Sequence, residues 1–152
     1  MRYFAYGSNM DAGQMSERCP SARLLGRARL DGYRLGFTTY ARTRQCGVAD
    51  VIADPSSSVW GLLYELDESD LPALDRAEGH PVKYQRVEVA VRTDADVVET
   101  ASCYEVVRKR PFQTPSAHYL GLMVDAARLH RFPDAYIAEL EAVPCRERAP
   151  EG

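Results

Sequence analysis

Residues 3–10 read YFAYGSNM, and this stretch decides how the rest of the sequence is interpreted. It begins as a short apolar strand, breaks at Gly7, and is followed by a helix-start signal at Asp11. A strand that turns into a helix through Gly-Ser-Asn leaves backbone N–H groups unpaired, and such groups bind anions or a developing oxyanion. Gly7 permits a positive φ and close approach of a ligand to the backbone. The same letters also occur in ordinary turns, so the remainder of the chain must decide between the two interpretations.

Length, composition and charge favour one ordinary globular domain. The chain has 152 residues, which suffices for one domain with its own core, and its 45% hydrophobic and 27% charged residues are typical of such a domain. The net charge of -3 and the lack of a long basic run argue against nucleic acid as a partner. The densest basic cluster, 108–110, is interpreted as a solvated loop or strand end.

The sequence also favours a cytoplasmic protein without a metal or cofactor. No apolar stretch reaches the length of a membrane helix, and residues 1–3 run into a strand without a signal-peptide pattern. The cysteines are scattered without a CxxC pair, which predicts free thiols, and the histidines lack metal-ligand spacing. These residues are Cys19, Cys46, Cys103, Cys145, His80, His118 and His130.

Hydrophobic periodicity and turn residues predict an α+β fold. Asp11 caps a helix to Arg18, with Gln14 placed as in a capping box. Asp31-Gly32 is interpreted as a hairpin turn and 54–58 as a turn that ends a strand. The predicted strands are 3–6, 22–30, 33–39, 48–53, 59–66, 84–91 and 97–107, with a loop at 43–47 and a hairpin loop at 93–96.

Three further helices complete the predicted fold. The first is capped by Asp67 or Ser69 and ends at Gly79, where a C-terminal glycine precedes Pro81. The other two cover 116–130 and 133–143. The sequence thus predicts a single domain over 1–143 and a frayed tail over 144–152.

Glu78 is the candidate acid–base residue. It ends the helix before Gly79, where the helix dipole disfavours an anion by about 0.3–1 kcal/mol. Partial burial would raise its pKa further, and a carboxylate of raised pKa is a better proton acceptor near neutral pH. An exposed glutamate at a helix end has the same sequence signature.

Three more positions can be interpreted in two ways. Gly61 interrupts a bulky strand, either inside the core or beside a cavity. Tyr84 and Tyr119 are either packing residues or ligand contacts.

Taken together, these segments resemble the γ-glutamylcyclotransferase family, in the broad group that includes the AIG2-like proteins. The resemblance runs from about residue 3 to 143, and YGSN combined with a leucine-rich helix ending in Glu-Gly is its specific part. The matching segments are 6–10 (YGSNM), 60–66 (WGLLYEL), 74–79 (LDRAEG), Tyr84, 115–119 (PSAHY) and 133–140.

The resemblance implies a small mixed β-barrel surrounded by helices, the γ-glutamylcyclotransferase-like fold, with a site at the barrel mouth. It implies cyclisation of a γ-glutamyl group to 5-oxoproline, with release of the amine. Glu78 matches the catalytic glutamate of the family. The substrate-binding residues implied or considered for this small-molecule substrate are Tyr6, Gly7, Ser8, Asn9, Tyr84 and Tyr119.

This chemistry fits the residues that the sequence offers. The α-amine of the substrate attacks its own γ-carbonyl carbon, and orientation alone can lower the barrier by about 7–11 kcal/mol. The reaction needs neither a protein nucleophile nor a metal. Glu78 can remove a proton from the α-ammonium and then protonate the leaving nitrogen. The loop over 6–9 can hold either the oxyanion or the substrate α-carboxylate, and the sequence leaves both open.

Two other functions remain open at this stage. One is an enzyme that acts on a γ-glutamyl amine, such as a protected intermediate of a natural-product pathway. There Arg42 and Arg44 would favour an acidic leaving group if they line the cavity. The other is a ligand-binding protein that keeps the fold without turnover. The leaving amine, the use of glutathione and the formation of a homodimer are also left open.

Overall fold

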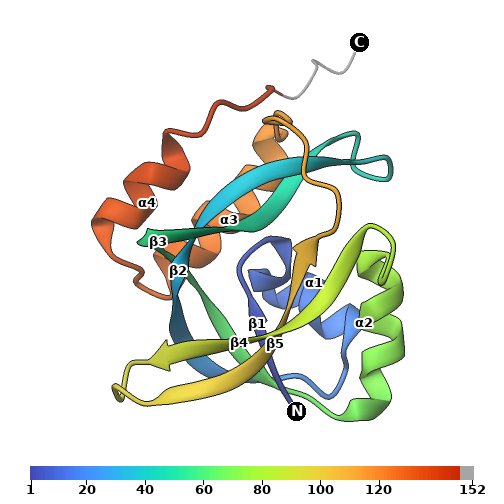
Figure 1. Cartoon of the computed structure of the whole chain (residues 1–152), viewed down its shortest axis with the longest axis vertical. Helices are drawn as coiled ribbons and strands as arrows, with labels where there is room; N and C mark the ends of the chain where they lie inside the picture. Colours follow the sequence, from blue (N-terminus) through green and yellow to red (C-terminus); the bar gives the residue numbers. More distant parts are fainter. Residues whose placement is uncertain (148–152) are drawn as a thin grey trace.

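A closed five-stranded barrel forms the centre of the molecule (Figure 1). The computed structural model describes residues 1–147. Its strands follow one another around the barrel in the order β1-β3-β2-β4-β5. Their bounds are β1 Arg2–Ala5, β2 Arg23–Ala41, β3 Cys46–Glu65, β4 Tyr84–Thr93 and β5 Val98–Val106.

The barrel is mixed, as predicted. Strand β1 runs parallel to β5, with Tyr3 opposite Ser102, and every other neighbouring pair is antiparallel. Helices surround the barrel, with α1 and α2 on one side and α3 and α4 on the other (Figure 1). The bounds are η1 Ser8–Met10, α1 Ala12–Arg18, η2 Glu68–Asp70, α2 Leu71–Glu78, α3 Ala117–Leu129 and α4 Asp134–Glu141, where η marks a short 3-10 helix.

The two turns predicted inside β2 and β3 are wrong, because both strands continue through them. Asp31 pairs with Ser58 and Tyr33 with Ala53, so residues 54–57 bulge opposite Gly32 alone. Gly32 has a φ of 84°, which favours glycine at this position. The hydroxyl of Ser58 donates to the Asp31 carboxylate at 2.6 Å. Bulge-forming and turn-forming residues share one sequence signature, and here they bend a long two-stranded ribbon.

Three helix ends agree with the predictions from the sequence, and a fourth does not. The Asp11 carboxylate accepts from the backbone N–H of Gln14, Ser116 caps α3, and Gly79 ends α2 in the left-handed conformation with a φ of 69°. The predicted cap of α2 is wrong: Asp70 precedes the helix without a side-chain cap, and its carboxylate accepts from Ser21. Tertiary contact with the loop after α1 therefore replaces local capping.

The core joins the barrel to its helices. Phe4 from β1 and Leu62 from β3 are fully buried, as are Leu74 of α2 and Met123 of α3. Apolar burial of this kind is the main force that fixes the helices against the barrel. Among the described residues, no helix combines the length and apolarity needed to cross a membrane.

Backbone atoms anchor the turn that joins β2 to β3, residues 42–45. The Lys83 ammonium donates to the carbonyl of Tyr40 at 2.6 Å, and the N–H of Gly47 donates to the carbonyl of Thr114 at 2.8 Å. The Arg146 guanidinium donates to the carbonyl of Gln45. The turn is thus held on both of its flanks.

The segment predicted as a frayed tail is attached at Arg146. Its N–H donates to the carbonyl of Pro115, and its own carbonyl accepts from the N–H of Ala117, both at 2.8 Å. Residues 144–147 thereby extend the packing next to α3, and the rest of the predicted tail, 148–152, lies outside the described residues.

Gly61 is required by close packing between β3 and β1. A Cβ at this position would meet the carbonyl oxygen of Ala5 and lie 2.7 Å from Cζ of Phe4. We expect Gly61→Ala to lower the free energy of unfolding by about 1–3 kcal/mol, because an inserted methyl group in a packed core forces the backbone to shift. Chemical denaturation measures this change.

The matched control is Gly121→Ala in α3, where a Cβ meets nothing within 4 Å. That variant should gain about 0.5–1 kcal/mol, since alanine favours a helix over glycine. Equal stability of the Gly61→Ala variant and the wild type would contradict the close approach.

Candidate functional site

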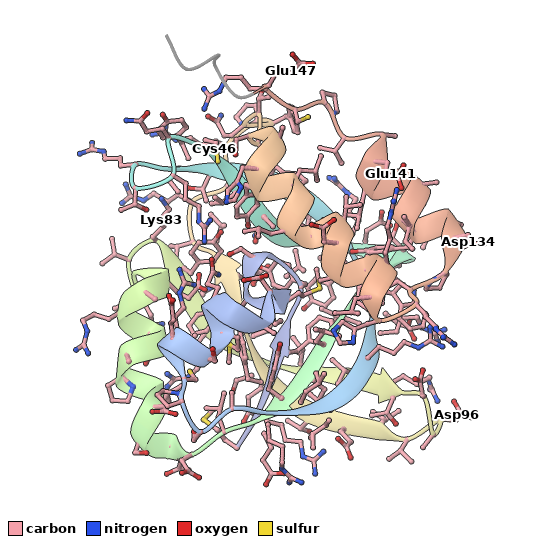
Figure 2. The ribbon with its side chains drawn as sticks, turned by 180° about the vertical axis from the view of Figure 1, so that it is seen from behind. Cys46, Lys83, Asp96, Asp134, Glu141 and Glu147 are labelled. Atoms are coloured by element: carbon pink, nitrogen blue, oxygen red, sulfur yellow. The ribbon has the colours of Figure 1, made fainter. Side chains whose placement is uncertain are left out.

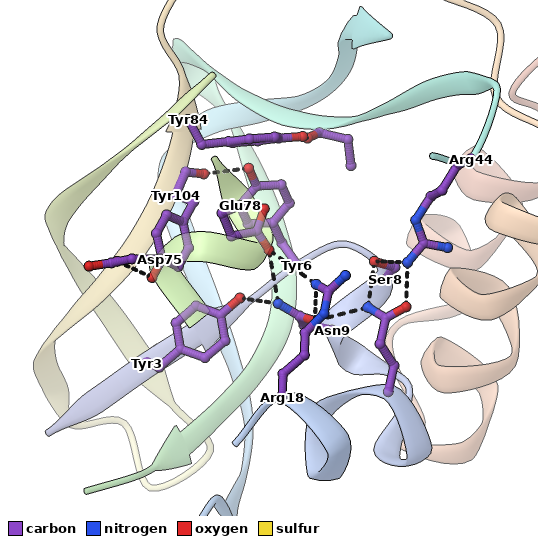
Figure 3. A network of polar contacts seen from close by, with 12 residues as sticks. Tyr3, Tyr6, Ser8, Asn9, Arg18, Arg44, Asp75, Glu78, Tyr84 and Tyr104 are labelled. Carbon is purple, nitrogen blue, oxygen red and sulfur yellow. Dashed lines mark hydrogen bonds and ion pairs between the residues drawn. The ribbon is translucent and has the colours of Figure 1, made fainter. Parts of the chain in front are cut away.

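The structure brings the seven predicted site residues to one cavity at the end of β1. Figure 3 shows Ser8, Asn9 and Glu78 among them. We call its narrow part, about 40 Å³, the inner pocket. Its walls are Tyr6, Gly7, Ser8, Asn9, Glu78, Tyr84 and Tyr119, together with Tyr3, Ala49 and Tyr104. Three of these residues come from η1 and the turn before it, and Glu78 ends α2.

The position of Gly7 is explained by close approach and not by a positive φ. Its φ is -110°, so the positive φ considered from the sequence is wrong. A Cβ here would lie 3.2 Å from the Tyr119 hydroxyl oxygen and 3.4 Å from Cβ of Ala49. Glycine therefore lets the chain pass from β1 into η1 in close contact with the Tyr119 hydroxyl of α3.

The turn leaves backbone donors available. Among the hydrogen bonds of residues 1–147, the N–H groups of Gly7, Ser8 and Asn9 donate none. The next two N–H groups, of Met10 and Asp11, bond back to the carbonyls of Gly7 and Ser8. Three consecutive N–H groups beside a cavity can bind an anionic oxygen.

The side-chain amide of Asn9 joins the loop to Glu78. Its Nδ2 donates to Glu78 Oε1 at 3.0 Å and to the Tyr3 hydroxyl at 2.9 Å. Its Oδ1 accepts from Gln14 Nε2 at 2.9 Å and from Arg18 Nη1 at 2.8 Å. A flipped amide would place its N–H₂ against two donors, so these four partners fix its orientation (Figure 3).

Gln14 and Arg18 of α1 support this arrangement from one face of the helix. They are four positions apart, a little more than one helical turn, so both side chains lie on the helix face that meets η1. The Gln14 side chain also donates to the Ser8 hydroxyl at 2.8 Å. Among the described bonds, the Gln14 side chain makes no hydrogen bond to the backbone of Asp11. The predicted capping box is therefore wrong, and only the cap by the Asp11 side chain forms.

Burial makes Glu78 a better base than an ordinary glutamate. Its side chain is 16% exposed, and this burial raises the pKa of its carboxyl above the usual value. The Arg18 guanidinium, 3.5 Å from Oε1, and the Asn9 hydrogen bond lower the pKa in part. The net direction is upward, so Glu78 binds a proton more readily than an exposed glutamate does.

Tyrosine hydroxyls line the rest of the inner pocket and are held by backbone groups. Tyr84 donates to the carbonyl of Ala49 at 2.6 Å, and Tyr119 accepts from the N–H of the same residue at 3.0 Å. Tyr6 donates to the carbonyl of Tyr104. Burial raises the pKa of each hydroxyl, that of Tyr119 to about 12, so these three side chains stay neutral.

A wider space of about 370 Å³, the outer pocket, opens from the inner one and shares Ser8, Glu78, Tyr84 and Tyr119 with it. Cations line it from several elements, whereas Glu78 is the one carboxylate among its described walls. These cations are Arg18, Arg42, Arg44, Arg76 and Lys83. Arg44 also donates to the Ser8 hydroxyl at 3.2 Å and lies over the Tyr119 ring.

A larger cavity of about 700 Å³ lies elsewhere, between α4 and the β2–β3 ribbon. Trp60, Phe37 and Tyr136 contribute to its walls, and none of the seven predicted residues does. The acid–base group and the free N–H groups therefore belong to the smaller site.

Sequence reasoning missed Tyr3, Gln14, Arg18 and Tyr104 at this site. One signal was present for two of them: Gln14 and Arg18 recur with helical spacing directly after YGSN, on the face that meets η1. The position of Tyr104 depends on the pairing of β5, which no local pattern specifies.

Fold and site define a small mixed-barrel enzyme with one buried carboxylate beside a strand-to-helix loop. The AIG2-like family matches residues 58–140. Curated γ-glutamylcyclotransferases of human and cattle are 32% and 30% identical over 148 residues, which cover 93% of this chain and 77% of each relative. A solved γ-glutamyl cyclotransferase structure superposes with a TM-score of 0.92 at 28% identity, over 99% of this chain and 92% of that one.

The chain therefore belongs to the γ-glutamylcyclotransferase family, within the AIG2-like group. Its relatives and its fold support an enzyme with cyclotransferase activity. The roles of the individual site residues remain predictions.

The contact between Arg18 and Glu78 predicts a measurable electrostatic effect. We expect Arg18→Met to raise the pKa of the Glu78 carboxyl, because the nearby guanidinium favours its anion. A carbon-13 NMR titration of the Glu78 carboxyl measures this change. Arg108→Met, at an exposed arginine outside both pockets, serves as the control. An equal pKa in both variants would show that Arg18 does not act on Glu78.

Proposed function

We propose that this protein converts a γ-glutamyl amino acid or γ-glutamyl amine to 5-oxoproline and the free amine. The α-nitrogen of the substrate attacks its γ-carbonyl carbon, and the bond from that carbon to the leaving nitrogen breaks. Two protons move from the α-ammonium to the leaving nitrogen, which departs as an ammonium. The reaction is internal to the substrate, so the protein supplies shape, proton transfer and charge stabilisation.

Glu78 is the general acid and base in this proposal. Its buried carboxylate, bonded to Asn9 and beside three unpaired N–H groups, is the observation that carries the proposal. The ionised carboxylate accepts a proton from the α-ammonium and frees the attacking nitrogen. The same group then donates that proton to the leaving nitrogen as the tetrahedral intermediate collapses. The ring nitrogen loses its second proton, which passes to the departing amine and makes it an ammonium. A raised pKa of the Glu78 carboxyl suits both steps, because it brings this pKa closer to those of the substrate nitrogens with which the proton is exchanged.

The loop over 7–9 stabilises the oxyanion of the tetrahedral intermediate. Its N–H groups have no acceptor among the described residues and lie in the wall of the narrow inner pocket, where a hydrogen bond to an anion is stronger than in bulk solvent. The substrate α-carboxylate then pairs with Arg44, whose guanidinium lies beside the Ser8 hydroxyl.

The proposed compartment is the cytoplasm, whose reducing conditions keep thiols free. Three cysteines, Cys19, Cys46 and Cys103, are buried and unpaired among the described residues.

Glu78→Gln tests the proposal directly. We expect loss of at least about a hundredfold in 5-oxoproline release, the usual minimum for a general base, with the fold retained. Release is measured by chromatography from a panel of γ-glutamyl amino acids, glutathione and γ-glutamyl amines.

Thermal unfolding of the same variant is an internal check. A carboxyl whose pKa is raised by folding destabilises the native state once it is ionised. Glu78→Gln should therefore be at least as stable as the wild type at neutral pH, and this difference should shrink as pH falls through the folded pKa. Near-normal turnover in a well-folded variant would refute the role of Glu78, whereas failure of the wild type on the whole panel would favour a binding protein.

The pH dependence of the wild type gives a separate prediction. Glu78 must be ionised to accept a proton, so kcat/KM should fall as pH decreases through its pKa in the free enzyme. Because burial raises that pKa, the fall should begin at a higher pH than for an exposed glutamate. Arg18→Met should move this acidic limb to still higher pH. If kcat/KM instead falls at the pH of an ordinary glutamate, and Arg18→Met does not move this fall, then a group other than Glu78 accepts the proton.

A further inference from the structure

The outer pocket carries more positive charge than its walls neutralise. Arg18 is opposed by Glu78 at 3.5 Å, and Arg44 bonds to Ser8 and Gln14. Among residues 1–147, Arg42, Arg76 and Lys83 have no carboxylate within salt-bridge distance. They come from separate elements, the β2–β3 turn, the last turn of α2 and the segment before β4. The chain as a whole has a net charge of -3, so this concentration is local.

Three cations that line one space repel one another, and the one carboxylate among its described walls, Glu78, lies within salt-bridge distance of Arg18 alone. The closeness of Arg42 is one reason why the pKa of the Lys83 ammonium lies below its ordinary value, after burial. Lys83 is nevertheless held in place by its bond to the carbonyl of Tyr40. Such an arrangement favours a ligand that brings negative charge to the outer pocket.

The two pockets divide a γ-glutamyl substrate at Glu78. Glu78 must reach both the attacking and the leaving nitrogen, so the amide that breaks lies where the pockets join. In the proposed function the γ-glutamyl part faces the loop over 7–9, and its α-carboxylate reaches Arg44, which lies beside Ser8 and Tyr119 where the pockets join. The leaving group then extends into the outer pocket toward Arg42, Arg76 and Lys83.

We infer that the preferred leaving group is an acidic amino acid, whose two carboxylates pair with Arg42, Arg76 and Lys83. This inference rests on the proposed function and names its substrate class. An ordinary amino acid brings one carboxylate to this space, and a simple amine brings none. A dicarboxylic leaving group therefore matches the three unopposed cations better than either.

The test compares γ-glutamylglutamate with γ-glutamylglutamine, which have nearly the same size and differ by one negative charge. The wild type should prefer the acidic substrate in kcat/KM by roughly tenfold, the effect of one added carboxylate that contacts two partly exposed cations. The preference should decrease at high ionic strength, because salt screens such pairs. Release from γ-glutamylalanine provides the reference activity.

Arg42→Gln and Arg76→Gln are the test variants, because both side chains are exposed and neither has a side-chain hydrogen bond among residues 1–147. Each should reduce the preference to roughly threefold. Arg108→Gln removes the same charge from an exposed arginine outside both pockets and should keep the wild-type preference. Circular dichroism verifies that all three variants fold.

The other outcomes separate the two proposals. Equal kcat/KM on both substrates in the wild type, with release from γ-glutamylalanine, overturns the acidic leaving group and leaves the proposed function intact. A variant that slows both substrates by the same factor also overturns it, since the cations would then hold the γ-glutamyl part. Absence of 5-oxoproline from every substrate refutes the proposed function, and the acidic leaving group with it.

Discussion

The hydrogen bond from Asn9 to Glu78 is the interaction on which the rest of the site depends. A buried carboxylate is costly unless it is paired or hydrogen-bonded, and here one amide side chain supplies that donor. The same amide is oriented by α1, through Gln14 and Arg18, and by β1, through Tyr3. The end of α2 is thus joined to α1 and β1 through this amide, and to α1 also by the direct contact between Arg18 and Glu78. A change in the packing of α1 against η1 would reach Glu78 through this amide.

The sequence alone predicted the parts of this molecule that are specified locally. The strand-to-helix break at Gly7, the cap at Asp11 and the C-terminal glycine of α2 are each specified by a few adjacent residues. The continuity of β2 and β3 was missed because a glycine in a bulge and a glycine in a turn look alike until the partner strand is known. Gln14 was interpreted as a capping residue for the same reason, since its use at Ser8 and Asn9 requires the tertiary contact with η1. The resemblance placed Glu78 at the site, but its burial depends on how α2 packs beside the loop.

The two pockets separate two demands that one surface could not meet equally well. Proton transfer and oxyanion stabilisation require a small space with neutral walls, where fixed dipoles are not screened. Recognition of a variable leaving group requires charge and partial access to solvent. In the proposed function, tyrosine hydroxyls bonded to the backbone meet the first demand, and the cations of the β2–β3 turn and α2 meet the second. Viewed from behind, Lys83 lies beside the end of α2, on the same side of the molecule as the β2–β3 turn (Figure 2).

The anchors of the β2–β3 turn have a consequence for how this protein can diverge. Lys83, Arg146 and Thr114 hold the turn through main-chain atoms of Tyr40, Gln45 and Gly47, so the bonds do not depend on which side chains the turn carries. Residues 42 and 43 are exposed and can be exchanged without the loss of any of these bonds. If the proposed function holds, point substitution at these two positions can alter which leaving group is accepted, while Glu78 and the loop over 7–9 stay as they are.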